Sequence, residues 1–291
     1  QKYCEQIAYN ALGAKQANYV SVIVMNPKNG EIMAMVNAPE FDLNNPYSLT
    51  EEFLNDTSGK SKQDLLNNMW RNQCINDTYE PGSTFKIVTA TAALSENLVS
   101  LDSTFNCPGF VVVDDRRIRC HKTTGHGSQD FVHGTMNSCN PVFVNVGLRV
   151  GVKKFYNYMD KLGLLKTTGI DLPGEAGTII HKQKNVGNVE LATMSFGQSF
   201  QITPVQFLTA ASAIVNGGNL VTPHFGVEIR NENNETVKKL KYNELNNTLD
   251  EKIYENMIDY AYNLGIRNCF VQEQDSKGKC FIPDFTQKIE R

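Results

Sequence analysis

A serine and a lysine three residues apart, Ser83 and Lys86, are the two residues of this sequence best placed to do chemistry together. In a helix, side chains at positions i and i+3 lie on one face, so the lysine amine can take the proton of the serine hydroxyl. Burial and the positive end of the helix dipole both disfavour the ammonium form, which is what a lysine base needs. The pair therefore predicts a serine nucleophile with a lysine general base.

The residues around this pair predict a turn that runs directly into a buried helix. Pro81-Gly82 is typical of a turn, Ser83 is a good N-cap residue, and residues 87–94 are apolar on nearly every side. Ser-x-x-Lys alone is a weak pattern, because chance supplies about one in a chain of this length. Residues 276–279 match it in a polar stretch. The alternative is therefore an N-cap serine followed by a solvated lysine.

Composition indicates a globular protein and excludes some classes of partner. The chain has 291 residues, 41% of them hydrophobic, and a net charge of −3. Without a run of lysine or arginine, nucleic acid and anionic membrane are not expected as main partners. No stretch of about 18 apolar residues occurs, and the N-terminus has neither an initiator methionine nor a signal-peptide pattern, so we expect a fragment. Seven cysteines, an odd number, leave the cellular compartment open.

The elements expected to hold the serine and lysine are a hairpin and several helices. Residues 19–25 and 31–36 flank a turn and predict a β-hairpin that is apolar enough to need helices on both faces. A short helix precedes it, and residues 39–78 predict an irregular approach to the site. Further along, the patterns predict a second hairpin over 105–120, in which 111–113 and 117–120 are short strands. Helices are expected over 131–136, 142–150 and 204–216.

A second polar pair, Ser138 and Asn140, falls on the loop between two of these helices, where a hydroxyl and an amide can project into a cleft. The alternative is that Asn140, which precedes Pro141, is only the N-cap of the next helix. Another Ser-x-Asn triplet, at Ser95, lies twelve residues along the same helix as Ser83. It is therefore about 18 Å away and cannot share a cleft with that serine.

With these motifs in order, the sequence resembles the transpeptidase domain of class B penicillin-binding proteins, especially the septal and sporulation type of Gram-positive bacteria. The similar stretches share the family's order along the chain and are 24–32, 80–86, 125–127, 137–143, 171–175 and 195–198. The resemblance implies an α/β (α+β) fold of the penicillin-binding and serine β-lactamase type. In it, an antiparallel sheet is covered by helices on both faces, and an all-helical lobe carries Ser83. Residues 1–267 would form this domain, and 268–291 a linker or the start of a PASTA-like module.

The resemblance also implies an acyl-transfer mechanism. Ser83 would attack the penultimate D-alanine carbonyl of a peptidoglycan stem peptide with Lys86 as its base, and β-lactams would acylate the same serine. Ser138 would relay a proton to the departing D-alanine, and Asn140 would hold the lysine amine and the substrate amide. No cofactor is needed for this chemistry. Three further residues are expected to bind substrate: Cys139, Gly197 and Gln198.

The implied setting is the extracytoplasmic face of the cell membrane, reached through an N-terminal anchor. A membrane glycosyltransferase and division or sporulation proteins would be the partners. A serine β-lactamase or a β-lactam sensor is the nearest alternative, because both share the Ser-x-x-Lys helix. A class A β-lactamase also needs a glutamate with an asparagine close to it on a loop. Glu175 could supply the glutamate, but residues 175–178 contain no asparagine. From another class, the chain could be a non-catalytic scaffold in cell-wall assembly.

One family motif is missing: Lys-[Ser/Thr]-Gly on a sheet strand, which should follow Ser138 by well over a hundred residues. Lys122 begins a similar run, but that run has an extra residue and precedes Ser138. After Gly226 the sequence predicts one convincing strand, at 227–229. An amphipathic stretch near 253–264 then has helical spacing and resembles the family's last helix. We therefore expect the sequence to be spliced across missing residues near 247–253, with the motif in the omitted part.

Two cysteines, Cys107 and Cys120, are expected to face each other across the second hairpin, with His121 and His126 close behind. A disulfide is the plain interpretation for an extracytoplasmic domain, and two buried thiols are another. A structural Zn²⁺ held by both thiolates and a histidine or aspartate is the third, because these ligands suit zinc.

Overall fold

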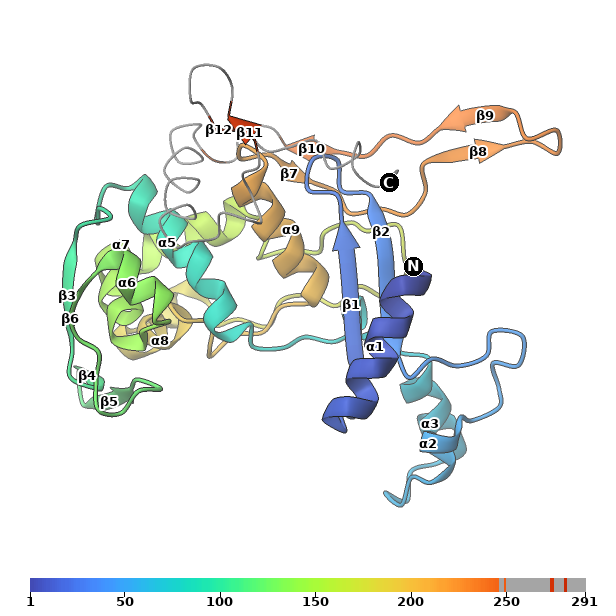
Figure 1. The fold of residues 1–291 in the computed structure, drawn as a ribbon, viewed down its shortest axis with the longest axis horizontal. Coiled ribbons are helices and arrows are strands. Elements are labelled where there is room, and N and C mark those ends of the chain that lie inside the picture. The colour runs from blue at the N-terminus through green and yellow to red at the C-terminus, as the bar shows by residue number, and fades with distance from the viewer. Residues whose placement is uncertain (246–248, 250–272, 275–279, 282–291) are drawn as a thin grey trace.

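The computed structural model describes residues 1–245, 249, 273–274 and 280–281. Figure 1 shows an N-terminal hairpin beside one helix and, to its left, a helical lobe. In the hairpin, β1 (Val20–Met25) pairs antiparallel with β2 (Ile32–Ala38), and the register shifts between Val24 and Met25. The predicted hairpin is therefore confirmed.

Helices cover both faces of this hairpin, as predicted. On one face α1 (Lys2–Lys15) buries Ala8 against Val36. On the other face, Met25 belongs to a cluster with residues of α4 and α9, so both faces of the ladder have helix contacts, while Val24 and Met33 stay exposed. These two helices span Gln73–Asn76 and Pro204–Val215. Thr203 caps α9 through a reciprocal bond with Gln206.

The lobe is built on two central helices. A 3₁₀ turn, η1 (Gly82–Phe85), leads into α5 (Lys86–Ser95), which packs along α7 (Asn140–Lys161). Phe85 is fully buried, with its ring centroid 5.9 Å from that of Phe155 and 4.8 Å from that of Phe200. The other helical elements of the lobe are α6 (Phe131–Met136), η2 (Gln183–Asn185) and α8 (Asn188–Met194).

The prediction of an all-helical lobe is wrong, because two small sheets lie against these helices (Figure 1). Both are antiparallel, and only one is a local hairpin: β4 pairs with β5, whereas β3 pairs with β6 from twenty residues further along the chain. A return strand of that kind leaves no turn signal in the sequence. The four strands are Thr104–Cys107, Phe110–Val113, Arg116–Arg119 and Gly127–Asp130.

The segment between the hairpin and η1 holds two more short helices, α2 (Glu51–Leu54) and α3 (Lys62–Met69). The serine before α3, Ser61, caps it by accepting a hydrogen bond from the Asp64 N–H. The expected irregular approach is therefore partly helical. Among the described residues, no helix combines the length and apolarity that crossing a membrane requires.

Beyond α9 the described chain forms three short two-stranded ladders. The predicted strand at 227–229 exists as β8 (Glu228–Arg230), but its partner β9 (Thr236–Lys239) has an exposed, polar pattern that concealed it. The other strands are β7 (Leu220–Val221), β10 (Glu244–Leu245), β11 (Glu273–Gln274) and β12 (Cys280–Phe281). The expected splice and final helix lie outside the described residues.

Candidate active site

Ser83 lies inside the 3₁₀ turn and points its hydroxyl at Lys86. Its Oγ is 3.0 Å from the Lys86 Nζ. The expectation that Ser83 is an N-cap is wrong, because Pro81 begins the turn and the α-helix begins only at Lys86. The hydroxyl is therefore not used to satisfy the helix end, and the exposed Ser83 can meet a substrate.

Lys86 is the buried centre of the site, with only 3% of its surface exposed. Besides Ser83, its Nζ meets three oxygen atoms: the Ser138 carbonyl at 2.8 Å, the Ser138 Oγ at 2.9 Å and the Asn140 Oδ1 at 2.9 Å. The structure thus brings together the four residues predicted to be catalytic, from two segments that are 52 residues or more apart in sequence.

Burial lowers the pKa of Lys86 from 10.5 to about 8, although the nearby thiols of Cys139 and Cys120, when ionised, oppose the shift. A neutral amine has two N–H groups and one lone pair. The Ser138 carbonyl and the Asn140 Oδ1 can only accept, so together they use both N–H groups. The lone pair is then left for a hydroxyl, and the amine can act as a base toward Ser83.

The loop that carries Ser138 and Asn140 is held in an uncommon backbone shape. Ser138 has φ of +46°, which turns both its side chain and its carbonyl toward Lys86. The side-chain N–H of Asn140 donates to the Arg119 carbonyl at 3.2 Å, so strand β5 fixes the amide. Asn140 is the first residue of α7 and Cys139 is its N-cap, so the N-cap alternative for Asn140 is wrong.

Gly197 and Gln198 lie in a turn that packs directly on Gly82, the residue before Ser83. The Gly82 N–H donates to the Gly197 carbonyl at 2.8 Å. A Cβ on Gly197 would fall 2.1 Å from the Gly82 carbonyl oxygen, so only glycine allows this approach. Gln198 is exposed beside them. Two of the three residues predicted to bind substrate thus lie beside the turn that carries Ser83.

Cys139 is the third residue predicted to bind substrate, and the structure places its side chain in the interior of the lobe. Its side chain is fully buried, and its Sγ belongs to a cluster of four metal-binding side chains whose ligand atoms all lie within 4.8 Å of one another. The thiol cluster comprises Cys107, Cys120, His126 and Cys139. The Cys139 side chain therefore points into the thiol cluster.

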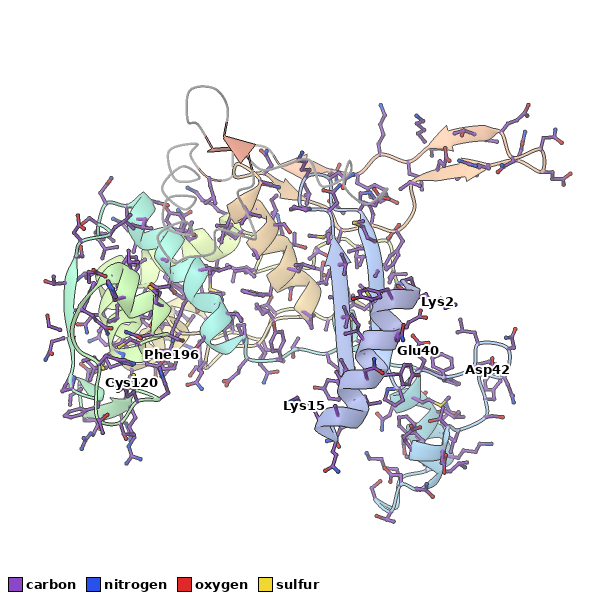
Figure 2. All side chains as sticks on the ribbon, viewed as in Figure 1. Lys2, Lys15, Glu40, Asp42, Cys120 and Phe196 are labelled. Atoms are coloured by element: carbon purple, nitrogen blue, oxygen red, sulfur yellow. The ribbon has the colours of Figure 1, made fainter. Side chains whose placement is uncertain are left out.

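The sequence predicted that Cys107 and Cys120 lie on one hairpin, and this prediction is wrong. Cys107 ends β3, whereas Cys120 follows β5, and both are free thiols without the disulfide that the plain interpretation required. Burial raises the pKa of Cys139 to about 12. For Cys107, burial is the largest influence, but hydrogen bonds from the main chain of His126 and Gly109 outweigh it and lower its pKa. Figure 2 places Cys120 in the helical lobe.

The Nδ1 of His126 lies 3.6 Å from the Cys120 Sγ, and that of His121 lies 3.8 Å away. The two histidines are therefore close behind Cys120, as predicted. Burial is the main cause that lowers the pKa of His126, so its imidazole is biased toward the neutral form. The sequence did not indicate that Cys139 belongs to the thiol cluster. Its place between Ser138 and Asn140 was the only available signal.

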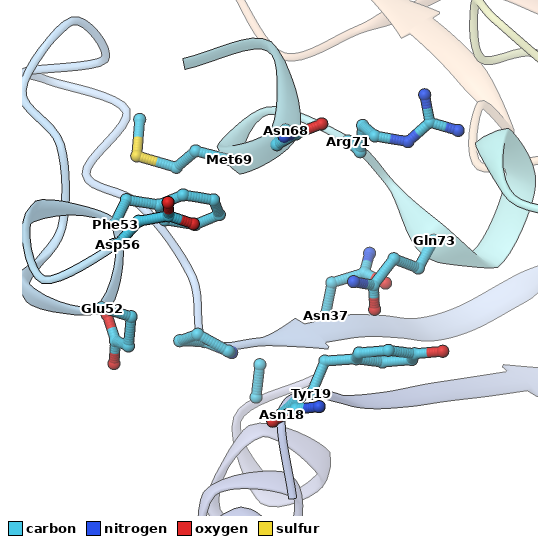
Figure 3. A pocket seen from close by; sticks show the side chains of 12 residues that line it. Asn18, Tyr19, Asn37, Glu52, Phe53, Asp56, Asn68, Met69, Arg71 and Gln73 are labelled. Atoms are coloured by element: carbon cyan, nitrogen blue, oxygen red, sulfur yellow. The ribbon is translucent and has the colours of Figure 1, made fainter. Parts of the chain in front are cut away.

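Two other features lie apart from this site. Glu175 accepts hydrogen bonds from the N–H groups of Thr168 and Gly169, at 2.7 and 3.1 Å, and so supports its own loop. A polar cavity of about 320 Å³ opens between the hairpin and α2–α3, where Figure 3 shows Tyr19 and Phe53 on different walls. None of the predicted site residues lines it.

Comparisons with known proteins agree with this geometry. The family model described as "penicillin binding protein transpeptidase domain" matches residues 20–261. Stage V sporulation protein D of Bacillus subtilis is 41% identical over 82% of this chain and 35% of its own length. The peptidoglycan D,D-transpeptidase MrdA of Haemophilus influenzae is 29% identical over 77% of this chain and 34% of its own length. The chain thus spans about a third of the length of these relatives.

Solved structures show the same fold. Penicillin-binding protein 3 of Mycobacterium tuberculosis, complexed with aztreonam, superimposes with a TM-score of 0.75 at 22% identity, over 89% of this chain and 55% of that one. The D,D-transpeptidase domain from Eggerthella lenta superimposes with a TM-score of 0.76 at 22% identity, over 91% of this chain and 64% of that one. The predicted resemblance is therefore confirmed, and the chain belongs to the penicillin-binding protein transpeptidase domain family.

Proposed function

We propose that this chain is the catalytic domain of a peptidoglycan D,D-transpeptidase that works through an acyl-enzyme on Ser83. The observation that carries the proposal is the buried Lys86 amine, 3.0 Å from the Ser83 Oγ and held by oxygen atoms of Ser138 and Asn140. A lysine kept from solvent, with a lowered pKa, is suited to activate a serine and is costly to keep for any other purpose.

In the first half-reaction, the Ser83 Oγ bonds to the penultimate D-alanine carbonyl carbon while its proton passes to the Lys86 amine. The carbon–nitrogen bond to the last D-alanine then breaks. The departing amine takes a proton through the Ser138 hydroxyl, which lies 2.9 Å from the same Nζ. The Ser83 N–H, in the first turn, is one donor to the developing oxyanion and contributes about 3 kcal/mol.

In the second half-reaction, the amine of a neighbouring stem peptide attacks the acyl carbon and gives up a proton to Lys86. The ester bond to Ser83 then breaks, and Lys86 returns a proton to the Ser83 Oγ. The cross-link is thereby formed without a cofactor. Penicillin-binding protein 3 of Mycobacterium tuberculosis forms a complex with the β-lactam aztreonam, which supports the proposal that β-lactams also acylate Ser83 here. Similarity to stage V sporulation protein D favours a sporulation role on the extracytoplasmic face of the membrane. A membrane glycosyltransferase is the partner that such a role needs.

A β-lactamase is the second candidate, and the position of Glu175 argues against it. A class A β-lactamase uses a glutamate to activate the deacylating water. Here both carboxylate oxygens of Glu175 bind main-chain N–H groups of its own loop. We therefore expect a penicilloyl-enzyme that hydrolyses slowly.

The test is covalent labelling of the full-length protein by a fluorescent penicillin, followed by peptide mapping. Wild type should be labelled once, on Ser83, and Ser83→Ala should not be labelled. Ser128→Ala removes an exposed hydroxyl on β6 and is the matched control. A wild type that folds but is not labelled would favour the non-catalytic scaffold, and rapid turnover of penicillin would favour the β-lactamase.

We also infer that the thiol cluster binds a structural Zn²⁺. Three thiols and one imidazole form a standard zinc ligand set, and their ligand atoms all lie within 4.8 Å of one another. Zn–S bonds of about 2.3 Å in a tetrahedron place the sulfur atoms about 3.8 Å apart, so the cluster needs little rearrangement. Zinc would tie the two small sheets to the loop that carries Ser138.

Metal analysis of protein purified without a chelator tests this inference. One zinc per chain is expected, and Cys107→Ser should lower the zinc content. Cys4→Ser, which changes a half-buried thiol in α1 far from the thiol cluster in sequence, should not. Full zinc content in a chain that lacks both Cys107 and Cys120, or no zinc in wild type, would contradict it.

A further inference from the structure

We infer that Glu80 is a positioning residue for the acylation step, because it holds the turn of residues 197–199 against the nucleophile turn. Its Oε1 accepts a hydrogen bond from the Ser199 N–H at 2.8 Å, across 119 residues of sequence. The inference rests on the acyl-enzyme function proposed above. No described contact of Glu80 reaches Ser83 or Lys86, so its effect must pass through the turn that it holds.

The contact completes a row of bonds between two segments. On one side of Glu80, Tyr79 and Ile202 exchange main-chain hydrogen bonds in both directions, at 3.0 and 3.1 Å. On the other side, the Gly82 N–H donates to the Gly197 carbonyl at 2.8 Å. Between these two pairs the main-chain ladder is broken, and the Glu80 side chain supplies the missing acceptor.

The break has a physical cause in the backbone of Ser199. Ser199 has φ of +65°, in the left-handed region that a residue with a Cβ seldom adopts. Its N–H consequently points away from a regular strand partner and toward Glu80. The Ser199 hydroxyl is held as well, 2.8 Å from the Thr193 Oγ1. A strained residue persists when the surrounding structure fixes it, and these two bonds do so.

The turn matters for catalysis because it touches the residue next to the nucleophile. Gly82 packs so closely on Gly197 that a Cβ has no room between them. A shift of the turn must therefore move Gly82, and with it the Ser83 hydroxyl and N–H. Exposed Gln198 would move too. Reactions that depend on near-attack geometry are slowed by displacements of about 1 Å, so the acylation rate is the quantity that should respond.

Glu80 is itself exposed, so water can replace part of its bond and the effect should be moderate. We expect Glu80→Ala to slow the first-order acylation step by penicillin about tenfold, with little change in the noncovalent dissociation constant. Glu80→Gln keeps an acceptor oxygen at the same reach and should stay within about twofold of wild type. Glu80→Ala should also leave the thermal midpoint nearly unchanged.

A suppressor variant separates positioning from direct contact with substrate. Ser199→Gly gives up the hydroxyl bond to Thr193 but adopts the left-handed conformation without a Cβ penalty, and because this gain outweighs that loss the turn needs less support. In the background of Glu80→Ala it should restore most of the lost acylation rate. If instead Glu80→Gln is as slow as Glu80→Ala, the charge is needed and the positioning role is wrong. An unchanged rate in Glu80→Ala, or no rescue by Ser199→Gly, also overturns it.

Failure of this inference is distinguishable from failure of the proposed function. Wild type that does not label with penicillin, under conditions where it is folded, refutes the acyl-enzyme function itself. Wild type that labels on Ser83 but shows no dependence on Glu80 refutes only the positioning role. Stopped-flow measurement of acylation at several penicillin concentrations gives the rate and the dissociation constant in one experiment.

Discussion

The lowered pKa of Lys86 predicts that acylation of Ser83 depends on pH in the range where most lysines do not titrate. If the neutral amine is the base, the rate follows the neutral fraction of Lys86, whose pKa is about 8. That fraction is about one tenth at pH 7, about one half at pH 8 and about nine tenths at pH 9. The acylation rate should therefore rise about fivefold from pH 7 to 8 and about twofold more by pH 9.

The assay is single-turnover labelling with fluorescent penicillin from pH 6 to 9.5, at saturating penicillin. Lys86→Arg is the informative variant, because a guanidinium cannot be deprotonated in this range and should give no measurable acylation at any pH. Lys154→Arg changes a surface ion pair with Glu96 and is the matched control, with the wild-type profile expected.

A rate that falls as pH rises would refute the assignment of Lys86 as the base, and a rate that stays flat from pH 6.5 to 9 would refute a pKa of about 8 for its amine. A flat profile would mean that the amine is already neutral at pH 6.5 or is not in the rate-limiting step. A rise centred near pH 10 would mean that burial does not shift this lysine. Each outcome contradicts a lysine base that titrates near pH 8.

Two substitutions test the packing around the nucleophile. Gly197→Ala places a Cβ 2.1 Å from the Gly82 carbonyl oxygen, so we expect acylation to fall at least tenfold; labelling at wild-type rate would contradict this. Phe85→Ala empties a fully buried site between two aromatic rings and should lower the free energy of unfolding by about 3–5 kcal/mol in urea titrations. A loss below about 1 kcal/mol would show that the pocket collapses.

Much of the site could be predicted because short-range patterns fix it. The i, i+3 spacing of Ser83 and Lys86 survives the change from the expected α-helix start to a 3₁₀ turn, since both keep the two side chains on one face. The motif at Ser138 and Asn140 was tied to Lys86 only through the resemblance to the family. No local rule states which loop meets a helix 50 residues away.

The errors about the lobe strands, Cys107 and Glu80 share one physical origin, which is pairing between distant segments. Strand β3 was expected to belong to the same local hairpin as β5, but it pairs with β6 instead. Cys107 therefore enters the thiol cluster from the β3–β6 sheet, whereas Cys120 enters it from the end of β5. Glu80 gave no signal either, because its partner is a main-chain N–H 119 residues away. Backbone partners of that kind carry no side-chain pattern that a sequence could reveal.

The burial of Lys86 also has a cost that should be measurable as stability. Its pKa is 10.5 when unfolded and about 8 in the fold, so below pH 8 the folded protein holds a proton at a cost of about 3 kcal/mol. Because this folded pKa is depressed, wild-type stability rises as pH increases from about 8 to 10.5. Lys86→Met removes the amine and with it this dependence.

The stability of Lys86→Met relative to wild type should therefore become less favourable by about 2–3 kcal/mol between pH 6.5 and pH 10. Urea unfolding of both proteins at these two pH values measures the difference. Lys154→Met, which removes an exposed lysine, should show no such trend. An equal difference between Lys86→Met and wild type at both pH values would mean that Lys86 is not desolvated in the fold. The lone-pair argument for a neutral base at Ser83 would then lose its foundation, since an amine in contact with water has no reason to give up its proton near pH 8.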